Sequence, residues 1–152
     1  MISDTAKFGK INYKKSEIIW MARGLLGFEG QQKYVIVSIE NQEPFKWLQS
    51  LDDPSLAFLI IDPLLFKPDY VVDINPKDIT LLGARGIKDL VVFTIVTIPK
   101  GQPYKMSANL QGPVIINKIN MRAAQLVLGE SNYDTQYFIF GDIERRLAQS
   151  PA

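Results

Sequence analysis

The carboxylates of Asp52, Asp53 and Asp62 are the side chains of this sequence whose type and spacing come closest to chemistry. Two carboxylates held close together can act as general acid and base, and such oxygen ligands also bind hard cations such as Mg²⁺. However, Asp53 and Asp62 each precede a proline, a pattern typical of turns in which the carboxylate accepts a hydrogen bond from the nearby backbone. We therefore favour a turn-forming role for these aspartates over a catalytic or metal-binding one.

The 152-residue chain contains no histidine and no cysteine. Their absence removes the commonest general base, the imidazole metal ligand, thiolate nucleophiles and disulfide bonds. The glycines of GLLGFEG (24 to 30) are spaced by three and lack the Lys-Ser/Thr pair of a phosphate-binding loop, so they indicate a turn or a bulge between strands. We predict that the protein is not an enzyme and has no cofactor, metal ion or small-molecule substrate.

The charge is almost balanced, with 17 Lys and Arg against 16 Asp and Glu, which gives a net charge of +1. Such a chain creates no overall field that would attract nucleic acid or an anionic membrane. The triplet Phe45, Lys46 and Trp47 resembles the aromatic and basic surface of single-strand-binding barrels. Strand alternation places Phe45 and Trp47 on one face, where core packing explains them, so a nucleic-acid-binding β-barrel remains only the alternative.

Acidic residues gather in one part of the chain. The stretch from position 62 to position 78 contains four aspartates and only two lysines. The aspartates that follow Asp62 are Asp69, Asp73 and Asp78. The pattern fits either a solvated edge or a docking surface for a basic partner.

Short apolar and β-branched runs separated by Gly, Pro, Asn and Asp predict strands through most of the chain. The predicted strands span residues 7–13, 17–21, 33–39, 45–51, 56–61, 70–74, 90–98, 104–110, 113–117, 124–128 and 136–140. The turn signal PKGQP (99–103) predicts a hairpin between the strands that flank it. Because connections are short and no long amphipathic helix is present, neighbouring strands should be antiparallel. We predict a mainly β, single-domain, antiparallel β-barrel-like fold with one or two short helices.

Two short helices complete the prediction. Asn75 is placed as an N-cap before Pro76, and Gly83 follows the end of the first helix. Near the C-terminus, Asp142 can cap a short amphipathic helix, so residues 143–152 are predicted as a short helix and frayed tail. No linker or repeat divides the chain, and we predict one domain over residues 1–152.

No secretory signal is visible at the N-terminus, and the longest apolar run, residues 56–61, is far shorter than the ~20 residues of a membrane-spanning helix. We therefore expect a cytoplasmic protein without a membrane partner.

Several segments, in order, resemble the FliW flagellar assembly factors. They are GLLGFEG (24–30), EPFKWLQSLDDPSLAFLIIDPLLF (43–66), SANLQGPVIIN (107–117) and AAQLVL (123–128), and the similarity runs from about Phe8 to about Tyr133. The resemblance implies a non-enzymatic regulator that binds flagellin and alternately binds and antagonises the translational regulator CsrA. Such binding would couple flagellin synthesis to flagellin export.

Two candidate binding regions follow from this resemblance and from charge. Asp69, Asp73 and Asp78 are candidates for contact with CsrA, because an RNA-binding partner is expected to carry basic residues. The turn in SANLQGPVIIN is a fold-specifying corner or a contact for flagellin. Its candidate residues are Asn109, Leu110, Gln111, Gly112 and Pro113.

Overall fold

The structure is a computed structural model that describes residues 1–129 and 131–141. Its strands are β1 (Ile2–Thr5), β2 (Gly9–Asn12), β3 (Ile19–Trp20), β4 (Lys33–Val37), β5 (Lys46–Ser50), β6 (Ala57–Ile61), β7 (Leu90–Thr97), β8 (Ser107–Ala108), β9 (Val114–Asn117), β10 (Ala123–Gln125) and β11 (Tyr137–Phe138). Its α-helix is α1 (Pro76–Leu81), and its 3₁₀ helices are η1 (Lys15–Glu17), η2 (Glu40–Gln42), η3 (Pro63–Leu65), η4 (Ile87–Asp89) and η5 (Pro103–Lys105). The predicted C-terminal helix and its cap Asp142 lie outside the described residues.

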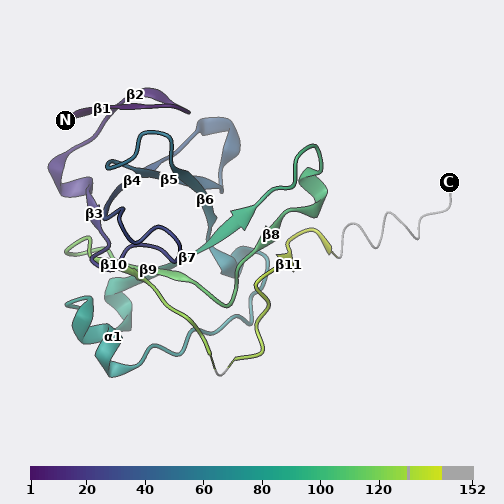
Figure 1. Cartoon of the computed structure of the whole chain (residues 1–152). Helices are drawn as coiled ribbons and strands as arrows, with labels where there is room; N and C mark the ends of the chain where they lie inside the picture. Colours follow the sequence, from purple (N-terminus) through teal and green to yellow (C-terminus); the bar gives the residue numbers. More distant parts are fainter. Residues whose placement is uncertain (130, 142–152) are drawn as a thin grey trace, which may run out of the picture.

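One large antiparallel sheet organises the chain (Figure 1). Its path runs β10-β9-β7-β6-β5-β4-β3, and β8 leaves this path to pair with both β7 and β11. A separate two-stranded sheet, β1-β2, lies at the top of the view. The prediction of a mainly β, antiparallel, single-domain fold is therefore confirmed.

The two ends of the large sheet meet at a single point. Trp20 of β3 forms an isolated parallel bridge with Arg122, and the Trp20 N–H donates to the Met121 carbonyl at 2.9 Å. Across the described residues no ladder of paired strands joins β3 to β10. The sheet is not found as a closed barrel, so the barrel-like part of the prediction is not confirmed.

Core clusters lie on both faces of the central strands, and one of them contains Tyr34, Leu48 and Ile60. In the ladder, Tyr34 pairs with Ser50, Leu48 with Phe58, and Ile60 with Ile95. Because side chains alternate along a strand, Tyr34, Leu48 and Ile60 point to one side, where all three are completely buried. Burial of an aliphatic side chain such as Leu48 or Ile60 stabilises the fold by about 1.5 to 3 kcal/mol relative to leaving it in water.

The strand predictions for 33–39, 45–51, 56–61, 90–98 and 113–117 are confirmed within a few residues. The predicted hairpin across PKGQP is also confirmed, with Thr97 opposite Ser107, although η5 shortens its second strand to β8. The predicted strands 17–21, 124–128 and 136–140 correspond only to the short strands β3, β10 and β11, and β10 begins one residue before the predicted range. At the N-terminus, β2 falls in the predicted strand 7–13, but its partner β1 was not predicted because ISDT lacks apolar alternation.

The predicted strand 70–74 is wrong as a ladder strand, because this segment pairs with no other strand among the described residues. Its exposure nevertheless alternates, with Tyr70 buried, Val71 and Asp73 exposed, and Val72 and Ile74 half-buried. The apolar pattern predicts this alternation, but it does not specify which strand would form hydrogen bonds with the segment.

The predicted helix at Asn75 is confirmed. The Asn75 Oδ1 accepts the backbone N–H of Asp78 at 3.0 Å, and Pro76 begins α1. Gly83 follows Leu82 with φ of +64°, a conformation that ends the helix and favours glycine. These signals start and stop the helix locally, and α1 then leads into η4 and β7.

Candidate partner-binding groove

The aspartates considered for catalysis are engaged in local structure. The Asp62 Oδ1 accepts the N–H of Leu64 at 2.9 Å and caps η3. The Asp53 Oδ1 accepts the Ser55 hydroxyl at 2.7 Å and its N–H at 2.9 Å, and these bonds lower the pKa of Asp53. The turn-forming interpretation is therefore confirmed for both residues.

The third of these aspartates also binds backbone. The Asp52 Oδ2 accepts the N–H groups of Gln32 and Lys33, at 2.7 and 3.0 Å, and ties the start of β4 to the end of β5. Within residues 1–129 and 131–141, no three metal-ligating side chains gather in a way that could hold an ion.

The glycine segment GLLGFEG forms the predicted turn between β3 and β4. Gly24 adopts φ of +64°, and a Cβ there would lie 2.6 Å from the Glu29 Cα, so only glycine fits without a backbone shift. The Leu26 N–H donates to the Gln125 Oε1 at 2.9 Å. This bond fixes the turn against β10 and leaves the Leu26 side chain exposed.

The segment Asn109 to Pro113 turns its polar groups inward. The Asn109 Oδ1 accepts the N–H groups of Gln111 and Gly112, at 3.1 and 3.0 Å. Leu110 is completely buried, and its carbonyl accepts the Tyr70 hydroxyl at 2.6 Å.

The rest of this turn is also occupied by contacts within the protein. Gly112 and Pro113 are buried, and the Gly112 carbonyl accepts the Gln125 Nε2 at 3.0 Å. The Gln111 side chain bonds the Leu128 carbonyl and the Ser131 hydroxyl. The segment thus forms a structural corner, and its contact with a partner stays a prediction.

A surface groove of about 1010 Å³ lies beside this corner. Three parts of the chain form it: the turn after β3, the extended segment that leads into α1, and the chain that follows β10. Its lining residues are Arg23, Gly24, Leu26, Val71, Asp73, Ile74, Asn75, Pro76, Asp78, Gln125, Leu126, Val127, Leu128, Gly129 and Ser131.

The groove brings together two of the three predicted acidic residues. Asp73 and Asp78 line it, whereas Asp69 lies outside the lining and pairs with Lys67, whose Nζ is 3.2 Å from the Asp69 Oδ1. This contact raises the pKa of Lys67. The groove touches the predicted corner through Gln125, which bonds both Gly112 and Leu26.

The electrostatics of the groove favour a basic occupant. Arg23 Nη2 lies 3.8 Å from Asp78 Oδ1, a long contact at a side chain that is 62% exposed, so solvent screens most of its energy. Among the residues that the structure describes, Asp73 forms no ion pair. Two carboxylates against one guanidinium leave this surface with a local negative charge.

Three exposed apolar side chains of the groove were not predicted as binding residues. Leu26, Val71 and Val127 are 60%, 67% and 61% exposed, respectively. Exposed apolar side chains grouped in one concave surface are typical of interaction sites. The alternation in YVVDI could have identified Val71, because it places Val71 and Asp73 on the same face.

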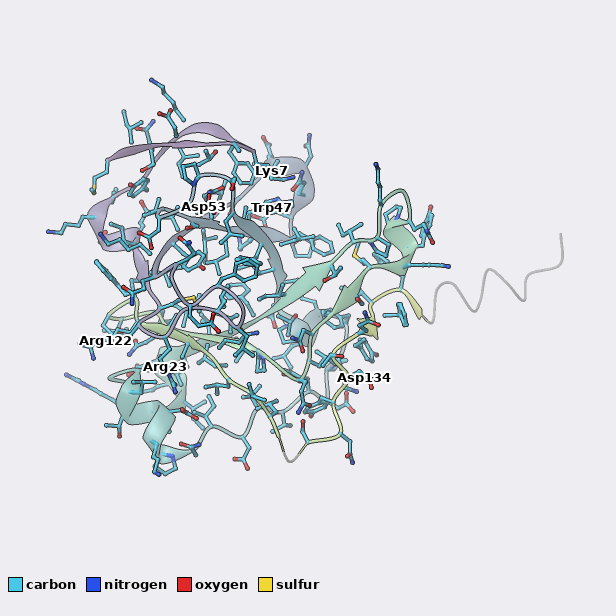
Figure 2. All side chains as sticks on the ribbon, viewed as in Figure 1. Lys7, Arg23, Trp47, Asp53, Arg122 and Asp134 are labelled. Carbon is cyan, nitrogen blue, oxygen red and sulfur yellow. The ribbon has the colours of Figure 1, made fainter. Side chains whose placement is uncertain are left out.

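The aromatic triplet considered for nucleic-acid stacking is engaged elsewhere. Trp47 Nε1 donates to the Gln42 Oε1 at 2.7 Å, and Phe8 contacts the Trp47 ring edge to face, with centroids 5.8 Å apart. Lys7 lies beside the ring, with its Nζ 4.4 Å from the centroid (Figure 2). Phe45 and Trp47 also pack against a buried cluster that includes Leu59, as the core-packing interpretation expected.

None of the described helices is both long and apolar enough to cross a membrane.

Comparison with known proteins identifies the family. The family model described as FliW protein matches residues 2–139. The flagellar assembly factor FliW of Treponema denticola is 44% identical over 140 residues, a match that covers 91% of this chain and 93% of that protein. The flagellar assembly factor FliW of Caldanaerobacter subterraneus subsp. tengcongensis is 37% identical over 142 residues, with 93% of this chain and 94% of that protein covered.

The fold agrees with this assignment. A crystal structure of the flagellar assembly factor FliW matches this structure with a TM-score of 0.85 and 28% sequence identity, over 91% of this chain and 96% of that chain. The resemblance that the sequence motifs indicated is therefore confirmed, and the chain belongs to the FliW family.

Proposed function

We propose that this protein is a flagellar assembly factor that acts in the cytoplasm by binding other proteins, without catalysing a reaction. Its relatives are named flagellar assembly factors, and the observation that supports a binding role is the groove of exposed apolar and acidic side chains. A concave surface of this composition can hold a protein segment through apolar contact and complementary charge.

We propose flagellin and CsrA as the two partners, bound in alternation. Free flagellin occupies the protein; when flagellin is exported, the protein binds CsrA and relieves the repression of flagellin translation. This mechanism needs only that binding of one partner weakens binding of the other, by the same factor in both directions.

The acidic side of the groove is the proposed site for CsrA. Asp73 and Asp78 line the groove, and Asp69 belongs to the same stretch of chain outside it. An RNA-binding protein carries basic residues, and opposite charges raise the rate of encounter and set the orientation of the complex. The corner at Asn109 and Gln111, beside the groove, is the proposed contact for flagellin.

Affinity measurements with charge variants test the site. In the triple variant Asp69→Asn, Asp73→Asn and Asp78→Asn, we expect the dissociation constant for CsrA to rise about tenfold at low salt and to depend less on salt concentration. A matched control removes three exposed acidic charges elsewhere, with Asp4→Asn, Glu40→Gln and Asp134→Asn. Equal affinity and salt dependence in the two triple variants would reject the acidic site.

A further inference from the structure

The segment Tyr70 to Ile74 has the side-chain alternation of a strand but no ladder partner among the described residues. Val72 and Ile74 pack inward, in the cluster that contains Leu82 and Leu126, while Val71 and Asp73 face outward into the groove. The Val71 N–H donates to the Tyr133 hydroxyl at 3.0 Å. In an extended chain every second N–H points to the same side, so the Asp73 N–H points the same way as that of Val71.

The opposite wall of the groove is a second extended segment. The N–H groups of Leu126 and Leu128 donate to the carbonyls of Pro113 and Gln111, both at 2.9 Å. Because successive N–H groups alternate in direction, the main chain of Val127 points away from residues 111–113. Val127 itself lines the groove, and β10 ends just before this segment.

Main-chain hydrogen-bonding groups are therefore available on both walls. Within residues 1–129 and 131–141, the N–H groups of Asp73 and Val127 donate to no partner. Exposed and unpaired edges of this kind are templates for pairing with another extended chain. In Figure 1 both segments run through the lower half of the molecule, beneath the large sheet.

We propose that the groove binds an extended peptide segment of a partner protein as an added β-strand. The peptide pairs its main chain with the edges at Asp73 and Val127, and so supplies the ladder that residues 70–74 lack. The inference rests on the proposed function only in that a partner protein provides the segment. Strand addition is an established mode of peptide recognition in which main-chain bonds give affinity and side-chain contacts give specificity.

The side chains around the groove define the chemistry of the peptide. One face of the added strand contacts Leu26, Val71 and Val127 and should be apolar. Basic side chains on the peptide reach the carboxylates of Asp73 and Asp78, which line the same groove. The expected ligand is an extended segment of apolar and Lys or Arg residues. An amphipathic helix would satisfy the apolar and charged surfaces and leave the two main-chain edges unpaired.

A titration with synthetic peptides, followed by the backbone amide signals of the protein in NMR spectra, tests the proposal. The probe is an acetylated, amidated octapeptide of alternating Val and Lys. We expect binding that shifts the amide signals of Asp73 and Val127 and slows their hydrogen exchange. Two further peptides carry N-methyl groups on the Val or on the Lys amides, which removes main-chain donors and keeps the side chains. Each should bind at least about tenfold more weakly.

Charge exchange provides a matched control. Asp73→Lys should lower the affinity for the Val-Lys peptide and raise the affinity for a peptide of alternating Val and Glu. Asp69→Lys lies outside the groove and should change neither affinity by more than about twofold. Strand addition would be overturned if the N-methylated peptides bound as tightly as the unmethylated Val-Lys peptide. It would also be overturned if the bound peptide were helical by circular dichroism, or if the amide signals of Asp73 and Val127 did not shift.

The outcome is separable from the proposed function. If CsrA and flagellin bind and compete while the Val-Lys peptide leaves the groove signals unchanged, strand addition is wrong and the function stands. If the peptide binds as expected but neither protein binds, the groove is a peptide site and the proposed partners are wrong.

Discussion

Several Asp and Asn side chains of this protein direct the local backbone. Asp62 caps η3, Asn75 caps α1, and Asn109 holds the turn before β9. Such local roles can be predicted from sequence, because Asp and Asn before proline or at a helix start act within a few residues. The burial of Leu110 could not be predicted this way, because Leu110 packs with Tyr70, which lies 40 residues away and donates its hydroxyl to the Leu110 carbonyl.

The left-handed glycine at position 24 provides a first prediction. In Gly24→Ala, the new Cβ would lie 2.6 Å from the Glu29 Cα and 2.8 Å from the Phe28 carbonyl oxygen, so backbone must move. Gly27 also has positive φ, at +86°, but no atom lies within 4 Å of the Cβ position. We expect Gly24→Ala to lower the free energy of unfolding by about 2 to 4 kcal/mol, measured by urea denaturation. Gly27→Ala should lower it by about 1 kcal/mol. Equal losses would show that the close approach at Gly24 is unimportant.

The buried hydroxyl of Tyr34 provides a second prediction, which concerns pH. Burial, together with the negative charge of Asp52, raises the pKa of Tyr34 to about 12. The folded state therefore keeps a proton that the unfolded chain loses near pH 10, so the stabilisation is complete below pH 10 and is lost as the pH rises toward 12. We expect Tyr34→Phe to make the alkaline decline in unfolding free energy shallower, as measured by denaturation between pH 8 and 12.

At neutral pH the same substitution should cost little. The Tyr34 hydroxyl has no hydrogen-bond partner within the described part of the chain, so Phe removes an unsatisfied polar group. Tyr70→Phe is the contrasting control, because the Tyr70 hydroxyl donates to the buried Leu110 carbonyl and its loss should cost about 1 to 2 kcal/mol. A larger loss at Tyr34 than at Tyr70 at pH 7 would contradict this account.

The turn between β9 and β10 holds α1 against the sheet. Asn117 is completely buried, and its Nδ2 donates to the Leu82 carbonyl at the end of α1, at 2.9 Å. The Asn120 Nδ2 donates to the same carbonyl at 2.9 Å. Two amides from one turn thus satisfy a carbonyl at the helix end, where backbone acceptors lack partners within the helix.

Replacing the buried amide should loosen this connection. Asn117→Ala removes one of the two amide donors to the Leu82 carbonyl, which keeps its bond from Asn120. It also removes the acceptor of the Ile119 N–H, which lies 2.9 Å from the Asn117 Oδ1. We expect a loss of about 2 to 4 kcal/mol in the free energy of unfolding, and faster hydrogen exchange in α1. The exposed Asn12→Ala in β2 should change stability by less than about 0.5 kcal/mol. An unchanged exchange rate in α1 would show that the turn does not secure the helix.

Elements with strong local signals were predictable, and elements defined by their partners were not. Helix α1 has its cap, its proline and its terminal glycine in sequence, and all three act as predicted. Strand β1 has no apolar alternation and exists because it pairs with β2. Residues 70–74 have the alternation but no ladder, because pairing depends on which backbone edge lies opposite.

The groove is a property of the whole molecule. It joins Arg23 and Leu26, the segment before α1, and the chain after β10, which are separated by about 50 residues at each step. The density of acidic residues in the sequence identified Asp73 and Asp78 as candidate binding residues. The apolar groove residues Leu26 and Val127 could be assigned to the same surface only after the sheet order was known. Composition had limited the function classes, because a chain without His and Cys lacks the commonest catalytic groups.

A competition titration tests the central claim, which is that this protein acts by binding either flagellin or CsrA, one at a time. CsrA carrying a fluorescent label is bound to the protein, flagellin monomer is added, and fluorescence anisotropy reports the bound CsrA. The account predicts submicromolar binding of each partner alone, release of CsrA by flagellin, and reciprocal weakening by the same factor. Anisotropy that stays constant as flagellin binds to the same complex, or neither partner binding at micromolar concentration, would contradict it.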